Sequence, residues 1–283
     1  MNVSHTMKAN RMVLVVGVCL MALLFGLIVG VAAAAQGEAL FPSLSDNKKG
    51  EFKKSGVVIN HGNSSQGYVM VKYKESSKRL KVRITLNKKN YDYDLNGSGE
   101  FEVFPLQMGD GKYKITVFEE GKQRGKYAQL ASTTVSVKLD SPHIPFLYPN
   151  QYVHYTAESL AVAKSYEVCE GLTDEKEIVK AVYAFCSRQI SYHYARANSA
   201  KSGYLPDIDE VVQERKGICF DYAALMACML RVQGIPTQLV IGYADKTYHA
   251  WNNVLVDGKW YRFDATYNSM GNKANTYVEE RSY

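Results

Sequence analysis

The sequence has few cysteines and no long run of charge of either sign. Its 283 residues include five cysteines, and none of them forms a Cys-x-x-Cys pair or lies at metal-ligand spacing from a histidine. A structural zinc site and a disulfide scaffold are therefore not expected. The 34 Lys and Arg residues only slightly outnumber the 28 Asp and Glu residues, and they form no cluster longer than a pair. Such a distribution excludes the dense basic surface of nucleic-acid-binding proteins, and the lack of acidic clusters argues against a calcium site. We expect no metal, no cofactor and no nucleic-acid partner.

The N-terminal segment has the pattern of an export signal. Lys8 and Arg11 precede an uncharged apolar run at residues 12–31, and four alanines follow at residues 32–35. The run is about as long as a membrane-spanning helix, so residues 1–35 are predicted to be either a cleaved signal peptide or an uncleaved membrane anchor. The positive residues before the run place the remainder of the chain outside the cell, either membrane-anchored or secreted. A buried helix of a cytosolic protein is the less favoured alternative.

Residues 43–140 alternate between apolar and polar side chains with period two. Leu80, Val82, Ile84 and Leu86 illustrate the alternation, and glycine-rich turns separate such runs. The pattern predicts six to eight strands in an antiparallel sandwich of immunoglobulin or fibronectin type, in which Tyr113 would form a tyrosine corner. Three roles remain open for this domain: a spacer, a cell-wall adhesion module or a substrate-docking platform.

A proline-rich stretch at residues 141–150 is predicted to link this domain to a second one at residues 151–283. Apolar spacing and capping residues predict helices over 156–169, 174–190 and 219–233, and a short helix after Asp207 that Gly217 would end. Strands are predicted over 237–243, 249–256 and 259–266. Asp257-Gly258 between the last two strands is a strong signal for a two-residue hairpin turn.

Cys219 is the cysteine with a favourable chemical setting. It follows a glycine turn at the predicted start of a helix, where free backbone N–H groups favour the thiolate over the thiol. Cys228 lies in an apolar part of the same helix and is predicted to be inert core. Cys169 and Cys186 are predicted to be either buried thiols or a mutual disulfide.

The predicted hairpin brings a histidine and a carboxylate together. A two-residue turn would place Trp251 opposite Asp264, with His249 on the same face and diagonal to Asp264. A three-residue turn would put them on opposite faces. A thiolate, a histidine and an orienting carboxylate are the groups that nucleophilic acyl transfer requires.

Five motifs occur in the order and spacing of the transglutaminase-like core, which residues 155–268 resemble. They are Gly217-Ile218-Cys219-Phe220-Asp221-Tyr222-Ala223, Gly234-Ile235-Pro236, His249-Ala250-Trp251, Trp260 and Asp264-Ala265-Thr266. The resemblance implies an α+β, papain-like cysteine-hydrolase core with Cys219 as nucleophile, His249 as general base and acid, and Asp264 as orienting carboxylate. Trp251 would wall the substrate site or be a hairpin core residue. Ala265 replaces a proline that is frequent in the family.

The resemblance implies an enzyme that acts on a protein or peptide substrate by acyl transfer. The thioester formed on Cys219 would be released to water, as in a cysteine protease, or to an amine, as in a transglutaminase. In the sequences of papain-like proteases, the histidine follows the cysteine by well over a hundred residues. The spacing of 30 residues between Cys219 and His249 is too short for that class of protease. A non-catalytic surface or cell-envelope binding protein is the alternative from another class.

Overall fold

The computed structural model describes residues 39–46 and 50–283, which form a mixed α and β structure. The predicted signal peptide or membrane anchor at residues 1–35, and with it Cys19, lies outside the described residues. Within the described ranges, no helix combines the length and the apolar character needed to span a membrane.

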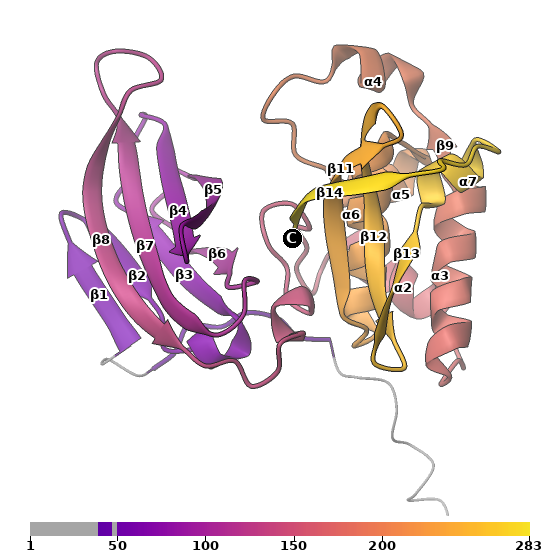
Figure 1. Ribbon diagram of the computed structural model, residues 1–283, viewed down its shortest axis with the longest axis horizontal. Helices are drawn as coiled ribbons and strands as arrows, with labels where there is room; N and C mark the ends of the chain where they lie inside the picture. The colour runs from indigo at the N-terminus through magenta and orange to yellow at the C-terminus, as the bar shows by residue number, and fades with distance from the viewer. Residues whose placement is uncertain (1–38, 47–49) are drawn as a thin grey trace, which may run out of the picture. The chain divides into compact units, whose positions relative to one another are not determined.

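In the N-terminal region, the described residues up to 140 contain eight strands in two antiparallel four-stranded sheets (Figure 1). The strands are β1 (Glu51–Lys54), β2 (Val57–Asn60), β3 (Tyr68–Tyr73), β4 (Leu80–Leu86), β5 (Lys89–Leu95), β6 (Glu102–Pro105), β7 (Gly111–Glu120) and β8 (Tyr127–Val137). One sheet has the order β1-β2-β3-β6 and the other the order β5-β4-β7-β8. A short 3-10 helix, η2 (Ser64–Gln66), precedes β3.

The alternation seen in the sequence determines which face of each strand is buried. In β4 the four apolar positions are buried and the three between them are half-exposed. Tyr113 of β7 is fully buried, and its hydroxyl donates to the carbonyl oxygens of Leu106 and Gly109 at 2.9 and 2.8 Å while accepting from the Met108 N–H. These bonds to the preceding chain are those of a tyrosine corner, as predicted.

Residues 141–150, the predicted linker, pack closely against the sheets that precede them. They contain the 3-10 helix η3 (Ile144–Phe146), in which Pro145 and Phe146 are buried. Gly67 approaches Pro145 so closely that a Cβ atom added there would lie 2.7 Å from the proline Cγ. The Tyr148 ring lies 4.7 Å from that of Tyr68. The segment is therefore held in place rather than exposed to solvent.

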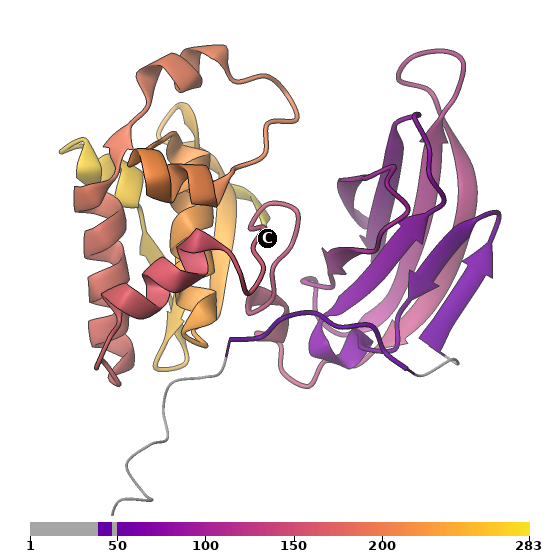
Figure 2. The same ribbon diagram turned by 180° about the vertical axis from the view of Figure 1, so that it is seen from behind.

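The C-terminal region consists of a four-stranded antiparallel sheet and a group of helices (Figure 2). The helices are α2 (Leu160–Val168), α3 (Glu175–Gln189), α4 (Tyr194–Ser199), α5 (Ile208–Glu214), α6 (Cys219–Val232) and α7 (Ala265–Ser269). The sheet has the order β13-β12-β11-β14, formed by β11 (Thr237–Ala244), β12 (Thr247–Val256), β13 (Lys259–Phe263) and β14 (Tyr277–Ser282). A separate parallel pair joins β9 (Ser191–Tyr192) to β10 (Lys216–Gly217). Helix α6 packs on β11 and β12, and α2, α3 and α5 pack on α6.

Several predicted element ends are wrong. The helix predicted over 156–169 begins only at Leu160, with Ser159 as its N-cap residue. The helix after Asp207 ends at Glu214 because Arg215 adopts a left-handed conformation, with φ of 55°, so that Gly217 is not its terminator. The strand predicted to reach Thr266 ends at Phe263 because Asp264 is the N-cap of α7. The predicted N-caps Asp174 and Asp207 are confirmed, since each side chain accepts from the main-chain N–H three residues ahead.

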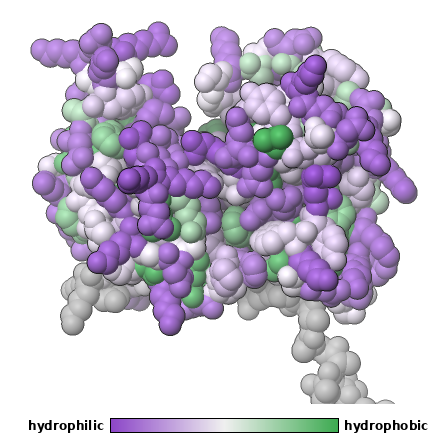
Figure 3. Space-filling view, viewed as in Figure 1, coloured by the Kyte–Doolittle hydropathy of each residue, from purple (hydrophilic) through white to green (hydrophobic). Residues whose placement is uncertain are grey.

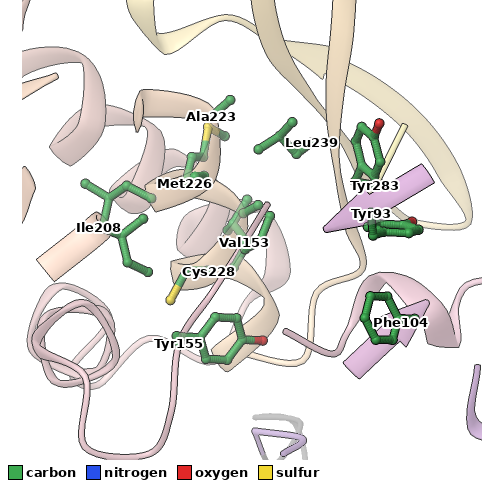
Figure 4. Close-up of a cluster of buried hydrophobic side chains, with 14 of the residues drawn as sticks. Tyr93, Phe104, Val153, Tyr155, Ile208, Ala223, Met226, Cys228, Leu239 and Tyr283 are labelled. Atoms are coloured by element: carbon green, nitrogen blue, oxygen red, sulfur yellow. The ribbon is translucent and has the colours of Figure 1, made fainter. Parts of the chain in front are cut away.

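Most of the buried hydrophobic residues of both regions form one cluster. Figure 4 shows Tyr283 above Tyr93 and Phe104 of the N-terminal sheets, with Ala223, Met226 and Cys228 of α6 across from these three rings. The Tyr283 ring lies 5.4 Å from that of Tyr91 and 4.0 Å from that of Tyr152. By contrast, hydrophobic residues form only scattered patches on the face seen in Figure 3.

Candidate active site

Cys219 is the first residue of α6, and a buried carboxylate fixes the turn before it. The main-chain N–H of Ile218 donates to Asp221 Oδ2 at 2.8 Å, which caps the helix start. A Cβ atom at Gly217 would lie 2.8 Å from the Cβ of Asp221, so only glycine fits there. Cys219 itself is half-buried. The remaining free N–H groups of the first helical turn surround its sulfur with partial positive charge.

Asp221 is fully buried and is held from a second direction. The Tyr204 hydroxyl donates to Asp221 Oδ1 at 2.6 Å, and Arg196 Nη1 lies 3.5 Å from Oδ2. Arg196 also pairs with Glu210 at 2.9 Å. Burial raises the pKa of Asp221, while its hydrogen bonds with Tyr204 and Ile218 oppose that shift. Asp221 thus completes the helix start and joins it to the segment that contains Tyr204.

The hairpin that carries His249 has the predicted register. Asp257 and Gly258 have φ of 49° and 72°, and these two positive values are those of a type I′ turn. Leu255 pairs with Trp260 as expected for a two-residue turn. His249 lies on β12 and is 4% exposed.

The structure brings all three predicted triad residues together. His249 Nε2 lies 2.8 Å from Asp264 Oδ2, and the His249 side chain also hydrogen-bonds with Cys219. Since Nε2 faces the carboxylate, Nδ1 is the ring nitrogen left to face the sulfur.

Asp264 reaches His249 by a different route from the one predicted. The expected ladder pair between Trp251 and Asp264 does not form, because β13 ends one residue earlier. Asp264 instead caps α7, and its Oδ1 accepts from the Tyr267 N–H at 2.9 Å, which leaves Oδ2 for the histidine.

Aromatic side chains enclose the His249–Asp264 pair. Tyr267 stacks on His249 with ring centroids 4.4 Å apart, and Trp251 stacks at 6.4 Å. The Tyr277 hydroxyl donates to Asp264 Oδ2 at 2.8 Å, and the Trp251 ring packs edge-on against Tyr277. Trp251 is 3% exposed, so it belongs to the hairpin core, where its ring supports that of His249. Sequence reasoning missed Tyr267 and Tyr277.

His249 has a strongly perturbed pKa. Burial alone would lower it, but hydrogen bonds and charge interactions with Asp264 and Cys219 outweigh burial and raise the pKa to about 9. The environment therefore favours imidazolium, which is the state that accompanies a thiolate in an ion pair.

The other described cysteines differ from Cys219. Cys169, Cys186 and Cys228 are all buried free thiols, so the disulfide considered for the first two does not form. Burial raises the pKa of each of the three. Among residues 39–46 and 50–283, no cluster of three or more His, Cys, Asp or Glu side chains could hold a metal ion.

Residues 162–265 match the model of the transglutaminase-like superfamily, and this range contains all three triad residues. This part of the chain is a transglutaminase-like domain. The match confirms the resemblance seen in the sequence motifs, and its limits agree with the helices and hairpin that carry Cys219, His249 and Asp264.

The chain is also similar to a human protein. Over 106 residues it is 27% identical to the kyphoscoliosis peptidase of Homo sapiens, which is 33% of this chain but only 16% of that relative. The chain therefore matches a small part of that protein's length.

Two crystal structures share a partial likeness. A candidate cysteine protease from Cytophaga hutchinsonii is 16% identical with a TM-score of 0.44, and the match covers 82% of this chain and 83% of that one. Red sea bream transglutaminase is 11% identical with a TM-score of 0.30, over 70% and 47% of the two chains. At such low TM-scores, the family match and the site geometry carry the assignment.

Proposed function

We propose that this chain is a thiol acyl-transfer enzyme that acts on protein or peptide amides through a thioester on Cys219. The observation that carries the proposal is the hydrogen-bonded series of Cys219, His249 and Asp264, with His249 buried between the other two. A carboxylate, an imidazole and a thiol in this order can form and break an acyl-sulfur bond.

Each triad residue has a separate role in the reaction. The Cys219 thiolate attacks the amide carbon, and the main-chain N–H of Cys219 stabilises the oxyanion. The His249 imidazolium then protonates the departing nitrogen, and the carbon–nitrogen bond breaks to leave the thioester. In the second half, neutral His249 takes a proton from water or from an amine as that nucleophile attacks the thioester carbon. The carbon–sulfur bond then breaks, which releases the product and returns the Cys219 thiolate beside imidazolium. Asp264 holds the ring orientation in both halves.

The group that receives the acyl chain from Cys219 distinguishes a cysteine protease or amidase from a transglutaminase. It is water in the first two enzymes and an amine in the third. The first half-reaction is the same in both, so the triad alone does not choose between water and an amine. A non-catalytic binding protein that keeps the fold remains the alternative from another class. The complete set of three polar residues and the raised pKa of His249 favour the enzyme.

We further infer that residues 43–140 form an immunoglobulin-type sandwich that carries the enzyme outside the cell. The sheet orders β1-β2-β3-β6 and β5-β4-β7-β8, and the tyrosine corner at Tyr113, support the first part. The basic, apolar and small-residue pattern of residues 1–35 supports the second.

The first experiment measures the rate of iodoacetamide alkylation at each cysteine as a function of pH, resolved by peptide mapping. In the wild type, Cys219 is expected to react fast near pH 6, and in His249→Ala that fast reaction should disappear. Cys169, Cys186 and Cys228 are matched controls within the same chain because they are buried. A Cys219 rate that rises only near pH 8.5, the ordinary thiol range, would contradict an assembled ion pair.

A second experiment distinguishes the acceptors and tests the binding alternative. Casein is incubated with the protein and a biotin-labelled pentylamine, and both biotin incorporation and new peptide termini are measured. Incorporation indicates transfer, and new termini indicate hydrolysis. Both products should be absent in folded Cys219→Ala. A ligand-binding activity that survives in Cys219→Ala, without either product in the wild type, would favour the binding protein.

A further inference from the structure

A pocket of about 300 Å³ lies beside Asp264 of the triad. Its walls come from β13, α7, Tyr183 of α3 and the chain that leads from α7 into β14. Figure 1 shows α7 and this connecting chain next to α3. The volume is at the lower end of the range of natural ligand sites, which suits a small ion or molecule.

Two side chains of the lining carry a positive charge that no described residue balances. They are Arg262 of β13 and Lys273 of the connecting chain, and both are exposed. Neither side chain forms a salt bridge or donates a hydrogen bond to another residue in the described ranges. The Arg262 guanidinium lies 3.9 Å from the centroid of the Tyr277 ring, which holds it at the pocket. Since both side chains are exposed, a ligand from solution can reach them.

Asp264, the acidic residue of the lining, is already hydrogen-bonded at both carboxylate oxygens. Its Oδ1 accepts from the Tyr267 N–H, and its Oδ2 accepts from His249 and from the Tyr277 hydroxyl. The raised pKa of His249 keeps the imidazole charged at neutral pH, so this cation balances the carboxylate. The pocket is therefore left with an excess of positive charge.

The other polar groups of the lining are neutral. Asn268 and Asn272 are exposed, and each amide can present a donor or an acceptor to a ligand, as can the Tyr267 hydroxyl. The Tyr183 hydroxyl already donates to the main-chain oxygen of Asp264 at 3.4 Å. These groups suit many ligands and do not select among them, so the two unbalanced cations determine the choice.

An oxyanion is the kind of ligand that two unbalanced cations favour. It would accept charge-assisted hydrogen bonds from both, and the planar fork of an arginine matches two oxygens of a carboxylate or a phosphate. A cation would be repelled. A neutral ligand would displace water from two charged groups and offer them weaker hydrogen bonds in return.

Two residues of the lining connect this pocket to the reacting imidazole. Asp264 Oδ2 lies 2.8 Å from His249 Nε2, and the Tyr267 ring stacks on that of His249 with centroids 4.4 Å apart. An anion in the pocket would therefore lie against the residues that hold His249 in place.

We propose that this pocket binds a small oxyanion through Arg262 and Lys273, one side chain away from His249. The site goes beyond the proposed function, because binding there requires no reaction at Cys219. Phosphate-type ions and the carboxylates of small organic acids share the required chemistry, so one probe of each kind is used.

The test is isothermal titration calorimetry of the full-length chain at constant ionic strength, since salt screens exposed charges. The probes are inorganic phosphate, succinate and succinamide, the neutral isostere of succinate. One of the two anions is expected to bind with a Kd of roughly 1 mM or tighter, and succinamide at least about tenfold more weakly than that anion. Tighter binding of phosphate would assign the site to phosphate-type ions, and tighter binding of succinate would assign it to carboxylates.

Four variants locate the binding. Arg262→Gln and Lys273→Gln each remove one charge and are expected to weaken binding of the tighter anion by about tenfold or more. Arg262→Lys keeps the charge but lacks the planar fork, so its loss of affinity should be smaller. Arg124→Gln removes a charge from an exposed position between β7 and β8, outside the lining. It is the matched control and should bind within about twofold of the wild type.

Chemical modification gives a second measure of the location, in the wild-type chain. Phenylglyoxal reacts with arginine side chains, and peptide mapping resolves the rate at each of them. At a concentration about tenfold above its Kd, the tighter anion should slow modification of Arg262 by about fivefold or more. Modification of Arg124 should proceed at the same rate with and without the anion.

No binding of either anion up to about 10 mM, or equally tight binding of succinamide, would overturn the oxyanion site. Unchanged binding in both Arg262→Gln and Lys273→Gln would do the same. A loss of affinity in Arg124→Gln as large as in these two variants would indicate general attraction to surface charge instead. A slow thiol at Cys219 would count against the enzyme assignment alone, because these titrations do not depend on its reactivity.

Discussion

The two ends of α6 each bury a charged residue, but they stabilise it in different ways. Asp221 in the first turn is 0% exposed and is held by the Tyr204 hydroxyl, the Ile218 N–H and Arg196. Arg231 in the last turn is 1% exposed and makes no salt bridge among the described residues. It donates instead to the main-chain carbonyl oxygens of Thr237, Tyr148 and Tyr283, at 2.7 to 3.0 Å.

The N-terminal end of α6 serves the reaction, and its C-terminal end holds distant parts of the chain together. Both charges complement the helix dipole, with the acid at the N-terminus and the base at the C-terminus. Asp221 shapes a turn only two residues from Cys219. Arg231 bonds residues 83 and 52 positions away in sequence, Tyr148 and Tyr283, so it ties the predicted linker and the residue after the last strand to the helix. We expect changes near the N-terminal end to affect mainly the reaction, and changes at Arg231 to affect mainly stability.

Asp264→Asn should produce the largest effect on the reaction. The Tyr267 N–H holds Oδ1 in place, so the new NH₂ group would face His249 Nε2. Nε2 would then have to accept a hydrogen bond, so the ring proton would move to Nδ1. With Nδ1 protonated, the ring could no longer take a proton from Cys219. We expect kcat/KM on casein to fall by about 10³-fold or more, as for a wrong histidine tautomer. A decrease of less than about tenfold would show that the carboxylate does not orient the ring.

Arg231→Met should have the largest effect on stability. Three carbonyl oxygens would lose their donor in a buried site, at a cost of about 1 kcal/mol or more each. We expect the free energy of unfolding in urea to decrease by about 3 kcal/mol or more. Arg231→Lys is the control, since one ammonium group retains the charge but cannot reach all three oxygens. Alkylation of Cys219 in the fraction that remains folded should stay fast, and its loss would contradict the division between the two ends.

Asp221→Asn should weaken the N-terminal end by a smaller amount. One of the two acceptors, for Tyr204 or for the Ile218 N–H, is replaced by a donor, and the attraction to Arg196 is lost. We expect a loss of about 1–3 kcal/mol in the free energy of unfolding. The decisive measurement is the rate of Cys219 alkylation in the folded variant, which should fall because the turn is no longer fixed. An unchanged rate together with a stability loss as large as that of Arg231→Met would remove the contrast.

The raised pKa of His249 predicts the pH range in which the reactive end works. The departing nitrogen needs a proton from imidazolium, so kcat should fall as the pH rises through about 9. Because the folded pKa lies above the ordinary value of 6.5, the charge interaction stabilises the fold fully below pH 6.5 and is lost as the pH rises through about 9. The stability difference between the wild type and His249→Gln should shrink over the same interval. A difference that is constant up to pH 9 or that grows with pH would refute this assignment.

Local sequence signals predicted most of the local structure that positions Cys219, His249 and Asp264. Asp257-Gly258 determined the turn type and hence the strand register, because both residues accept positive φ. The position of Cys219 at a helix start followed from the glycine before it and the apolar run after it. The placement of Asp264 could be predicted only in part, because the residue both follows a strand and caps a helix, and its capping role depends on where α7 packs.

Tyr277 and β14 could not be predicted in the same way. The strand Tyr277–Ser282 has charged residues at its centre and no apolar alternation, since most of its side chains are exposed. It is in the sheet because its main chain pairs with β11, which the pattern of side chains does not reveal. Tyr204 and Arg196 were missed for a related reason, because their partner Asp221 is distant in sequence and is reached only in the folded chain.

Tyr277→Phe should have the smallest effect on activity, and it tests how Asp264 holds His249 at the reactive end. The Tyr277 hydroxyl and His249 share the same carboxylate oxygen, so removal of the hydroxyl leaves Oδ2 to the histidine alone. The loss of one hydrogen bond to a charged group should lower kcat/KM by about three- to tenfold. The fall of kcat at high pH should also shift upward, because a carboxylate that no longer shares its oxygen stabilises imidazolium more strongly. Tyr261→Phe, at an exposed position of β13, is the matched control and should change neither value. A stability loss without any shift of the pH profile would assign Tyr277 to packing against Trp251 instead of to the orientation of Asp264.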